Sequence, residues 1–397
     1  MASFQASHVK FGQESQFNTK QSAFIEFIQN NNFWCLDALR CFSILAVIWH
    51  HSGGDSYSAN NILFAGHHGV TLFFVISGFL ITSLLIREKR RSGAISLSSF
   101  YMRRALRIFP LYYAVLLVYC ALVFILERHS EAGRAFIENL IYFATYTSNY
   151  FVVLGGDRVI FYFAWSLAVE EQFYLIWPAI EKYLEEYAAA LTAVLLIILV
   201  MLTNSPAFKE SDLLIVFLIK HLAIPISLGV LLAHALHSER VFNCLYSICT
   251  AVGMVWLSII LPFAILYFSS IPDIIFYLSL VFLLCTLLLN EGHIIRNFLS
   301  ITAFTKIGTV SYGLYLFHML ALNAVRKILP STEFFHSLLA YQLTCFILAS
   351  VLGYFIASLS YHYYEKPFLN LKKKWASDTL NANKRNQFEL HQTQKTT

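Results

Sequence analysis

The chain has 397 residues, of which 58% are hydrophobic and 13% are charged, and its formal net charge is +5. A soluble globular domain carries about twice that charged fraction, so this composition excludes an ordinary soluble protein. The positive charge lies mainly beside apolar segments, which is typical of the cytoplasmic loops of membrane proteins and does not indicate a nucleic-acid-binding surface. The sequence therefore predicts an all-α, polytopic bundle of transmembrane helices.

Apolar stretches long enough to cross a bilayer recur between residues 36 and 361. Ten spans are predicted, near residues 34–53, 66–86, 108–127, 161–182, 188–204, 213–236, 248–268, 272–290, 306–326 and 338–361. Residues 136–153 are a weaker eleventh candidate.

Basic residues predict the orientation of these spans, because positively charged loops stay in the cytoplasm. The run REKRR (residues 87–91) follows the second span, and lysines at positions 366 and 372–374 follow the last one. Both termini are therefore expected to be cytoplasmic, which requires an even number of spans and favours ten. With ten spans, Arg326 and Lys327 would lie on the outer side of the membrane, against the rule that basic loops stay in the cytoplasm. Residues 136–153 would then be interfacial, re-entrant or packed against the bundle.

The spans divide the chain into three predicted parts. Residues 1–32 form a polar cytoplasmic tail without the basic region and apolar core of a cleaved signal peptide, so the first span is the expected anchor. Residues 33–370 form the membrane domain, and residues 371–397 form a polar cytoplasmic tail. The seven cysteines show no paired spacing and indicate neither a disulfide framework nor a zinc site, so no metal is expected.

The first span, LDALRCFSILAVIWHH (residues 36–51), carries Asp37, Arg40, His50 and His51. Ionisable groups at membrane depth are costly and usually serve a function. Arg40 and His51 are eleven residues apart, so a helix places them on one face about 16 Å apart, with His50 about 80° away. The structural alternative is that Arg40 reaches the interface paired with Asp37, and that His51 faces lipid headgroups.

The third span begins in SFYMRRALRIFPLYY (residues 99–113). Arg104 and Arg107 are three residues apart and share a helix face at its cytoplasmic end. Guanidinium groups bind phosphates through two parallel hydrogen bonds, which makes this pair a candidate phosphate site. Simple anchoring of a positively charged loop is the alternative.

The fourth span contains AWSLAVEEQFYLIWP (residues 164–178). Adjacent helical residues point about 100° apart, so Glu170 and Glu171 cannot serve one partner equally. At least one carboxylate is expected to face a polar cavity, a histidine or a cation such as Arg40. A purely structural ion pair is the alternative.

The ninth span contains SYGLYLFHM (residues 311–319), with His318 two turns after Ser311 and with Tyr312 and Tyr315 nearby. A hydrogen bond from His318 to a neighbouring helix is favoured over a catalytic role for this residue.

Taken in order, these blocks resemble the integral-membrane acyltransferases of the type 3 family, bacterial enzymes that O-acylate cell-surface sugars, lipopolysaccharide and related glycans. LDALR with His51 resembles the opening motif, an arginine followed by ten residues and a histidine. GVTLFFVISGFLIT (residues 69–82) and YYEKP (residues 363–367) resemble later blocks, and the resemblance covers nearly all of residues 33–370. Ala38 replaces a usual glycine, and Thr71 stands where an acidic residue is common.

The resemblance implies about ten helices in a bacterial inner membrane and an acyl-CoA donor, with acetyl-CoA expected, supplied from the cytoplasm. The acyl group would pass to a hydroxyl of a surface glycan, lipopolysaccharide or glycolipid, with membrane lipids as the surroundings. Arg104 and Arg107 match the paired arginines that the family links to the coenzyme.

The same resemblance makes His51 the catalytic base, although the neighbouring His50 leaves a second possibility for that role. A histidine titrates near neutrality and can accept a proton from an attacking hydroxyl. Arg40 would stabilise the oxyanion or orient the base. Glu170 or Glu171 would polarise the histidine or neutralise Arg40.

Two other functions account for the same charges. A proton-coupled transporter of a glycan or polyol would use them as a proton relay, although the lack of an obvious internal repeat and the paired arginines argue against it. A non-catalytic membrane scaffold or sensor would use them for structure alone. Hydrolysis of acyl-CoA by the purified protein distinguishes the enzyme from a transporter. A histidine substitution that leaves function unchanged but lowers stability would indicate the scaffold or sensor.

Overall fold

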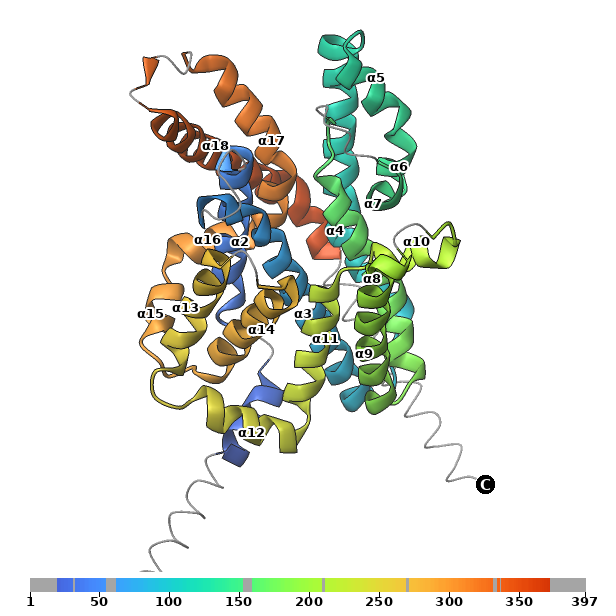
Figure 1. The fold of residues 1–397 in the computed structure, drawn as a ribbon, viewed down its shortest axis with the longest axis vertical. Coiled ribbons are helices and arrows are strands. Elements are labelled where there is room, and N and C mark those ends of the chain that lie inside the picture. The colour runs from blue at the N-terminus through green and yellow to red at the C-terminus, as the bar shows by residue number, and fades with distance from the viewer. Residues whose placement is uncertain are drawn as a thin grey trace, which may run out of the picture. The chain divides into compact units, whose positions relative to one another are not determined.

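The computed structural model describes residues 20–30, 33–54, 62–152, 159–208, 211–268, 271–330, 334–335 and 337–371. These residues form helices and turns and contain no strand, which confirms the all-helical prediction (Figure 1). The lysines at 372–374 and the C-terminal tail lie outside the described residues. The chain divides into two compact units, the first formed by Met1–Gly93 and Leu184–Thr309 and the second by Ala94–Tyr183 and Val310–Thr397.

Several helices are suited to a membrane. Among the described residues, four stretches are long and apolar enough to cross one: Ala65–Ser92, Leu97–Glu127, Glu186–Thr203 and Leu338–Leu371. Two helix pairs pass the same test only together, Leu214–Lys220 with Ile224–His237, bent by 66°, and Glu239–Cys249 with Met254–Tyr267, bent by 85°. These helices indicate an integral membrane protein with up to six such spans by length and composition, and the predicted ten spans and cytoplasmic termini stay predictions.

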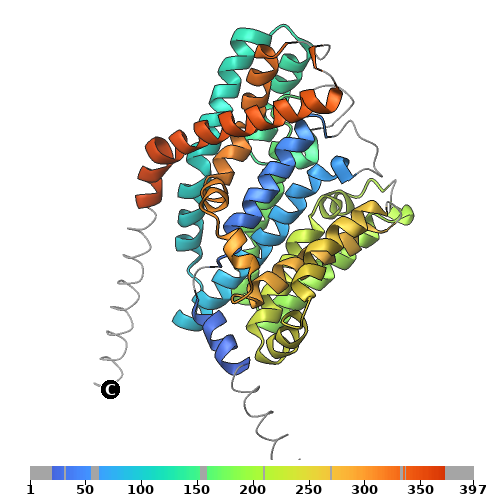
Figure 2. The same ribbon diagram turned by 90° about the vertical axis from the view of Figure 1, so that its left-hand side faces the viewer.

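The first unit is built around α3 (His68–Ser92), which packs along α11 (Ile224–His237) and beside α2 (Leu36–His51) (Figure 2). A Cβ atom on Gly78 would lie 2.0 Å from the carbonyl oxygen of Ile226, and one on Gly229 would lie 2.2 Å from that of Val75. Because only glycine fits at both positions, the backbones of α3 and α11 can approach closely. The other labelled helices of this unit are α9 (Glu186–Thr203), α10 (Leu214–Lys220), α12 (Glu239–Cys249), α13 (Met254–Tyr267), α14 (Asp273–Leu289), α15 (Ile295–Leu299) and α16 (Thr302–Thr309), with η2 (Ile62–His67) and η4 (Pro206–Phe208) as short 3-10 turns.

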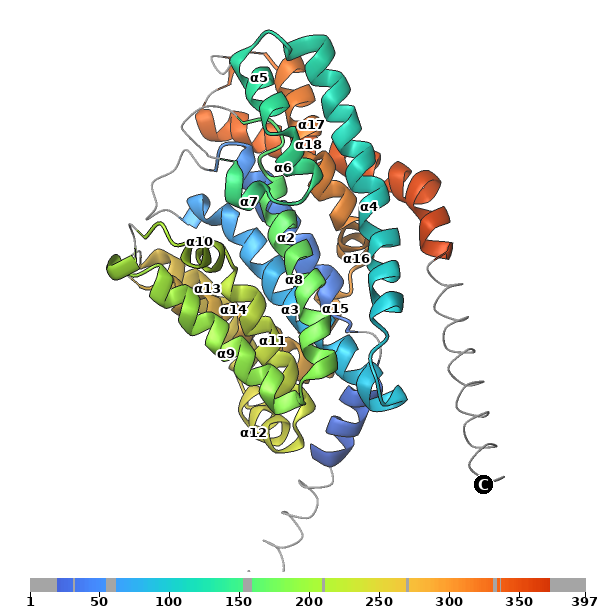
Figure 3. The ribbon, with the colours of Figure 1, turned by 90° about the vertical axis from the view of Figure 1, so that its right-hand side faces the viewer.

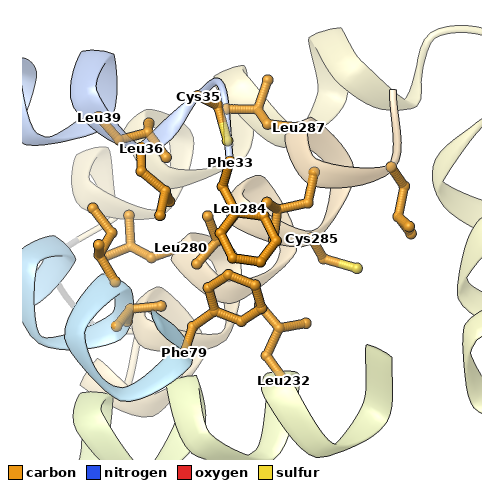
Figure 4. Packing of buried hydrophobic residues seen from close by; sticks show 14 of the residues in the cluster. Phe33, Cys35, Leu36, Leu39, Phe79, Leu232, Leu280, Leu284, Cys285 and Leu287 are labelled. Carbon is orange, nitrogen blue, oxygen red and sulfur yellow. The ribbon is translucent and has the colours of Figure 1, made fainter. Parts of the chain in front are cut away.

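The apolar core of this unit joins the start of α2 to α3, α11 and α14 (Figure 4). The rings of Phe33 and Phe79 meet edge to face with centroids 5.0 Å apart, and Leu232 and Leu284 pack in the same cluster. Aromatic pairs in this geometry add to the free energy gained from burying apolar surface. The core therefore fixes α2 against α3.

A helix over residues 20–29 lies within the predicted N-terminal tail and packs on this core through Phe27. The guanidinium of Arg87, a residue only 3% exposed, lies 5.2 Å and 4.7 Å from the ring centroids of Phe27 and Phe33. It donates hydrogen bonds to the carbonyl oxygens of Phe27, at 2.7 Å, and of Asn30, and to Nε2 of His237 at 3.2 Å. Arg87 thus ties the end of this helix to α3 and α11.

The second unit contains four long helices, α4 (Leu97–Leu122), α8 (Ala164–Tyr183), α17 (Ser311–Ile328) and α18 (Leu338–Ser360). A π-helical turn, η3 (Val123–Glu127), extends α4, and another, η6 (Tyr361–Glu365), extends α18. α17 packs along α18 and contacts α4, and α8 also contacts α4.

The weak candidate span at residues 136–153 is broken into short helices in the part of it that the structure describes. These are α6 (Leu140–Ala144) and α7 (Ser148–Phe151), preceded by α5 (Glu131–Glu138). These short helices lie beside α4 (Figure 3). The hydroxyls of Tyr112 and Tyr113 on α4 donate to the carbonyl oxygens at the end of α6, at 2.8 and 3.0 Å. These contacts pack the short helices against α4, and the choice among the three expected placements relative to the membrane stays a prediction.

Candidate functional site

The opening motif lies on one uninterrupted helix, α2, as predicted. Nη1 of Arg40 lies 2.9 Å from Oδ1 of Asp37, three residues earlier, so the ion pair expected from the spacing is present. The side chain of Arg40 is 18% exposed and that of Asp37 is 42% exposed. α16 packs at the same place, since a Cβ on Gly308 would lie 1.9 Å from the carbonyl oxygen of Asp37. The guanidinium is therefore held at the start of α2.

Four histidines gather where the end of α2 meets the start of α3. The ring centroids of His50 and His51 are 5.2 Å apart, those of His50 and His67 are 5.5 Å apart, and those of His67 and His68 are 4.0 Å apart. A Cβ on Gly69 would lie 2.3 Å from a backbone oxygen of α2, so this glycine permits the close approach. Within the described ranges, no group of three or more metal-ligating side chains has a geometry that could hold a metal ion.

His67 and His68 were not among the candidate residues predicted from the sequence. Their position directly before the apolar part of the second span could have identified them as candidates, because a pair of ionisable residues at the end of a span is rare in membranes. The side chains of both His50 and His51 are half-buried, so burial alone does not choose between them as the base.

In the second unit, Arg104 of α4 contacts α8 through an aromatic ring. Its guanidinium lies 5.0 Å from the ring centroid of Tyr174 and 5.7 Å from that of Phe100. The hydroxyl of Tyr174 donates a hydrogen bond of 2.6 Å to Oε1 of Glu170. Cation–π contacts hold a guanidinium without neutralising it. Arg104, Tyr174 and Glu170 thus form one array of cation, ring and carboxylate.

Arg107 and Glu171 extend this array. Arg107 interacts electrostatically with Arg104 and with Glu365 of η6, whose carboxylate accepts a hydrogen bond of 3.3 Å from Ser360. Glu171 interacts electrostatically with Glu170 and with Arg104. Arg104 therefore interacts electrostatically with both carboxylates within this unit, a partner that the sequence did not suggest for them.

The candidate site residues fall into two groups, one in each unit. Asp37, Arg40, His50 and His51 belong to the first unit, and Arg104, Arg107, Glu170, Glu171 and His318 belong to the second. The pairing of a carboxylate with Arg40 or with a histidine of α2 stays a prediction.

Gln172, next to the two carboxylates, fixes the turn between α6 and α7. Its Nε2 donates to the carbonyl oxygen of Tyr146 at 2.8 Å and to Oδ1 of Asn149 at 2.9 Å, and Asn149 donates back to Oε1 of Gln172 at 3.2 Å. Tyr146 has φ 53°, a left-handed conformation that is uncommon for a non-glycine residue. These contacts link α8 to the strained turn and were not predicted, because they join segments far apart in sequence.

His318 on α17 is fully buried. Its Nδ1 forms a hydrogen bond with the carbonyl oxygen of Tyr315, and its ring lies 4.9 Å from that of Phe163 between centroids. The hydroxyl of Tyr315 in turn donates to the carbonyl oxygen of Phe163 at 3.0 Å. The hydrogen bond to Tyr315 lies within α17, and the predicted bond from His318 to a neighbouring helix stays a prediction.

Comparison with known proteins gives the following matches. A family model described as "Acyltransferase domain" (acyltransferase 3) matches residues 33–359, which include parts of both units. A Bacillus subtilis (strain 168) protein named "Putative peptidoglycan O-acetyltransferase YrhL" is 28% identical over 369 residues, which are 84% of this chain and 54% of that protein. No solved structure matches.

Shorter matches are to "O-acetyltransferase OatA" of Staphylococcus aureus, with 38% identity over 157 residues, and to "Peptidoglycan O-acetyltransferase OatA" of Listeria monocytogenes, with 32% over 152 residues. They cover 38% and 36% of this chain and 24% and 23% of those proteins. The chain therefore aligns with about half of the length of the first relative and about a quarter of the other two.

Proposed function

This chain belongs to the acyltransferase 3 family, and we propose from that membership that it is an O-acyltransferase of the bacterial cytoplasmic membrane. It moves an acyl group, acetyl in the simplest case, from cytoplasmic acyl-CoA to a hydroxyl of a cell-surface glycan. The relatives are named O-acetyltransferases and peptidoglycan O-acetyltransferases, which favours acetyl as the group and a cell-wall glycan as the acceptor over lipopolysaccharide or a glycolipid.

The single observation that carries the proposal is the array on α4 and α8. The guanidinium of Arg104 stacks on the ring of Tyr174. The carboxylate of Glu170 accepts a hydrogen bond from the Tyr174 hydroxyl and not from Arg104. A guanidinium held in this way keeps its charge and its fork of N–H donors for a ligand. Arg104 and Arg107, which share a helix face, bind the phosphates of the coenzyme in this proposal.

The chemical step is assigned to the first unit. His51, or His50 beside it, takes the proton from the acceptor hydroxyl. The hydroxyl oxygen then attacks the thioester carbonyl, forming the C–O ester bond, and the C–S bond breaks. The histidine returns its proton to the sulfur of the leaving coenzyme A. Arg40, positioned by Asp37, stabilises the oxyanion that forms during the attack or orients the base.

The two carboxylates complete the proposed mechanism. Glu170 already accepts a hydrogen bond from Tyr174, which suits it to hold the ring on which Arg104 stacks. Glu171, the neighbour of Gln172, interacts electrostatically with Arg104 and is assigned to the same array.

Mass spectrometry of surface glycans tests the function. Glycans from cells that carry the wild-type protein, the His51→Ala variant or no protein are compared for a fixed mass increment. An acetyl increment that appears only with the wild type supports acyl transfer and identifies the donor class. No difference among the three, together with no hydrolysis of acetyl-CoA by the purified protein, overturns the proposal and favours a transporter.

A further inference from the structure

Four tyrosines of the second unit lie within electrostatic range of Glu171. Tyr112 and Tyr113 come from α4, Tyr312 comes from α17, and Tyr146 comes from the turn between α6 and α7. Glu171 interacts electrostatically with the hydroxyl of each of them. Phenol hydroxyls and a carboxylate are groups that bind polar ligands, so the partners of these hydroxyls decide what the cluster can do.

Three of the four hydroxyls donate to backbone carbonyls. Those of Tyr112 and Tyr113 bind the end of α6 at 2.8 and 3.0 Å, and that of Tyr312 binds α4 at 2.9 Å. Tyr146 is only 7% exposed, and its hydroxyl has no hydrogen-bond partner among the residues that the structure describes. A buried hydroxyl without a partner costs free energy, so a ligand that accepts its hydrogen bond would regain it.

The backbone holds Tyr146 in this position. Its left-handed φ of 53° is maintained by the hydrogen bond from Gln172 to its carbonyl oxygen, and its ring stacks on that of Tyr112 with centroids 4.3 Å apart. Strained residues persist where the surrounding structure fixes them, and such residues cluster at ligand sites. The Tyr146 hydroxyl is therefore presented in a fixed place rather than free to turn toward another acceptor.

The position of Tyr146 matches a part of the proposed donor that lies beyond its phosphates. Its stacking partner, Tyr112, is eight residues after Arg104 on α4, a rise of about 12 Å along the helix. A coenzyme whose phosphates lie at Arg104 and Arg107 would extend its pantetheine arm over such a distance. That arm carries two amide carbonyls and ends in the thioester carbonyl, all uncharged acceptors for a phenol O–H.

We propose that Tyr146 is a donor-binding residue, whose hydroxyl donates a hydrogen bond to an amide carbonyl of the pantetheine arm. This inference rests on the proposed function, because it assumes that the coenzyme binds at the two arginines of α4. It adds a contact for the arm to the contacts proposed for the phosphates.

The test uses the purified full-length chain and two probes, coenzyme A and adenosine 3′,5′-bisphosphate, which lacks the pantetheine arm. Tyr146→Phe is expected to weaken coenzyme A binding about 5- to 10-fold, as the loss of one hydrogen bond to a buried carbonyl would, and to leave bisphosphate binding unchanged. The melting temperature of the ligand-free variant should stay the same or rise. Tyr113→Phe is the matched control, because its hydroxyl already binds α6, and it should leave the affinity for both probes unchanged.

The outcomes separate the two proposals. If neither probe binds the wild-type protein, the proposed donor site is wrong and this inference falls with it. If both probes bind the wild type and Tyr146→Phe binds coenzyme A equally well, the role of Tyr146 is wrong while the proposed function stands. A variant that melts at a lower temperature or does not fold also overturns the inference, because the hydroxyl would then have a structural partner.

Discussion

The hydroxyl of Tyr174 donates a hydrogen bond of 2.6 Å to Glu170, which lies one turn earlier on α8. The ring of the same tyrosine faces the guanidinium of Arg104 at 5.0 Å. One side chain therefore separates a cation from a carboxylate while contacting both. This arrangement keeps Arg104 in place without forming the direct ion pair that would occupy its donors.

Replacing Tyr174 separates these two contacts. Tyr174→Phe retains the ring under Arg104 and is expected to leave the affinity for coenzyme A within about twofold. Tyr174→Ala removes the ring and should weaken binding about 3- to 30-fold, since a partly desolvated cation–π contact contributes about 0.5–2 kcal/mol. Titration of the purified protein with coenzyme A measures both, and equal affinities for the two variants would contradict the role of the ring.

The paired arginines of α4 are predicted to bind the phosphates. Arg104→Ala and Arg107→Ala should each weaken binding of acetyl-CoA about tenfold or more, because each removes charge-assisted hydrogen bonds to phosphate. Arg103→Ala is the control, since this residue lies about 100° around the helix from Arg104. Calorimetric titration at two salt concentrations provides the measurement. Unchanged affinity in both variants would remove these arginines from the donor site.

The two histidines at the end of α2 can be distinguished by single substitutions. His51→Ala is expected to lower acyl transfer at least about a hundredfold, the usual contribution of a general base, while membrane insertion and melting temperature stay unchanged. His50→Ala should retain most of the activity if His51 is the base. The rate of coenzyme A release in the presence of acceptor measures both, and the reverse order of activities would assign the role to His50.

Arg87 is predicted to be a major stabilising residue. Arg87→Ala leaves the carbonyl oxygens of Phe27 and Asn30 without their cation and removes two cation–π contacts. The free energy of unfolding should fall by about 3 kcal/mol. Arg91→Ala, at an exposed position nearby, should change it by less than about 0.5 kcal/mol. Thermal unfolding in detergent measures the difference, and similar melting temperatures for the two variants would contradict this prediction.

The crossing of α3 and α11 gives a prediction about packing. Gly78→Leu should prevent normal folding, because even a Cβ atom would lie 2.0 Å from a backbone oxygen of α11. Gly292→Leu is the matched control, since a Cβ there meets no atom within 4 Å. Size-exclusion chromatography of the two variants provides the comparison. A monodisperse Gly78→Leu protein with wild-type melting temperature would contradict the close approach.

The sequence predicted helices more accurately than breaks within them. The predicted spans near 34–53 and 188–204 correspond to α2 and α9, because long apolar runs are a strong helix signal. The predicted span near 213–236 instead corresponds to the sharply bent pair of α10 and α11, and the span near 248–268 begins at the break between α12 and α13. Pro225 at the start of α11 and Gly253, with φ 83°, mark these breaks, but apolar content averaged over a whole span hides them.

The candidate site was predicted in part for a similar reason. The pairing of Arg40 with Asp37 follows from helical spacing and could be anticipated. The stacking of Arg104 on Tyr174 joins two helices whose mutual placement no local pattern encodes. The sequence did not indicate Tyr146. Its distinguishing property is a buried hydroxyl without a hydrogen-bond partner among the described residues, and this can be recognised only in the folded structure.

The hydrogen bonds from Gln172 to the α6–α7 turn limit how chimeric enzymes can be built from this chain. The amide that secures Tyr146 and Asn149 lies on α8, directly after the two carboxylates. An exchange of residues 140–151 with the corresponding segment of a relative would therefore succeed only if position 172 were exchanged with it. The short helices and position 172 of α8 should be exchanged together, although Gln172 lies 23 residues after Asn149 in the chain.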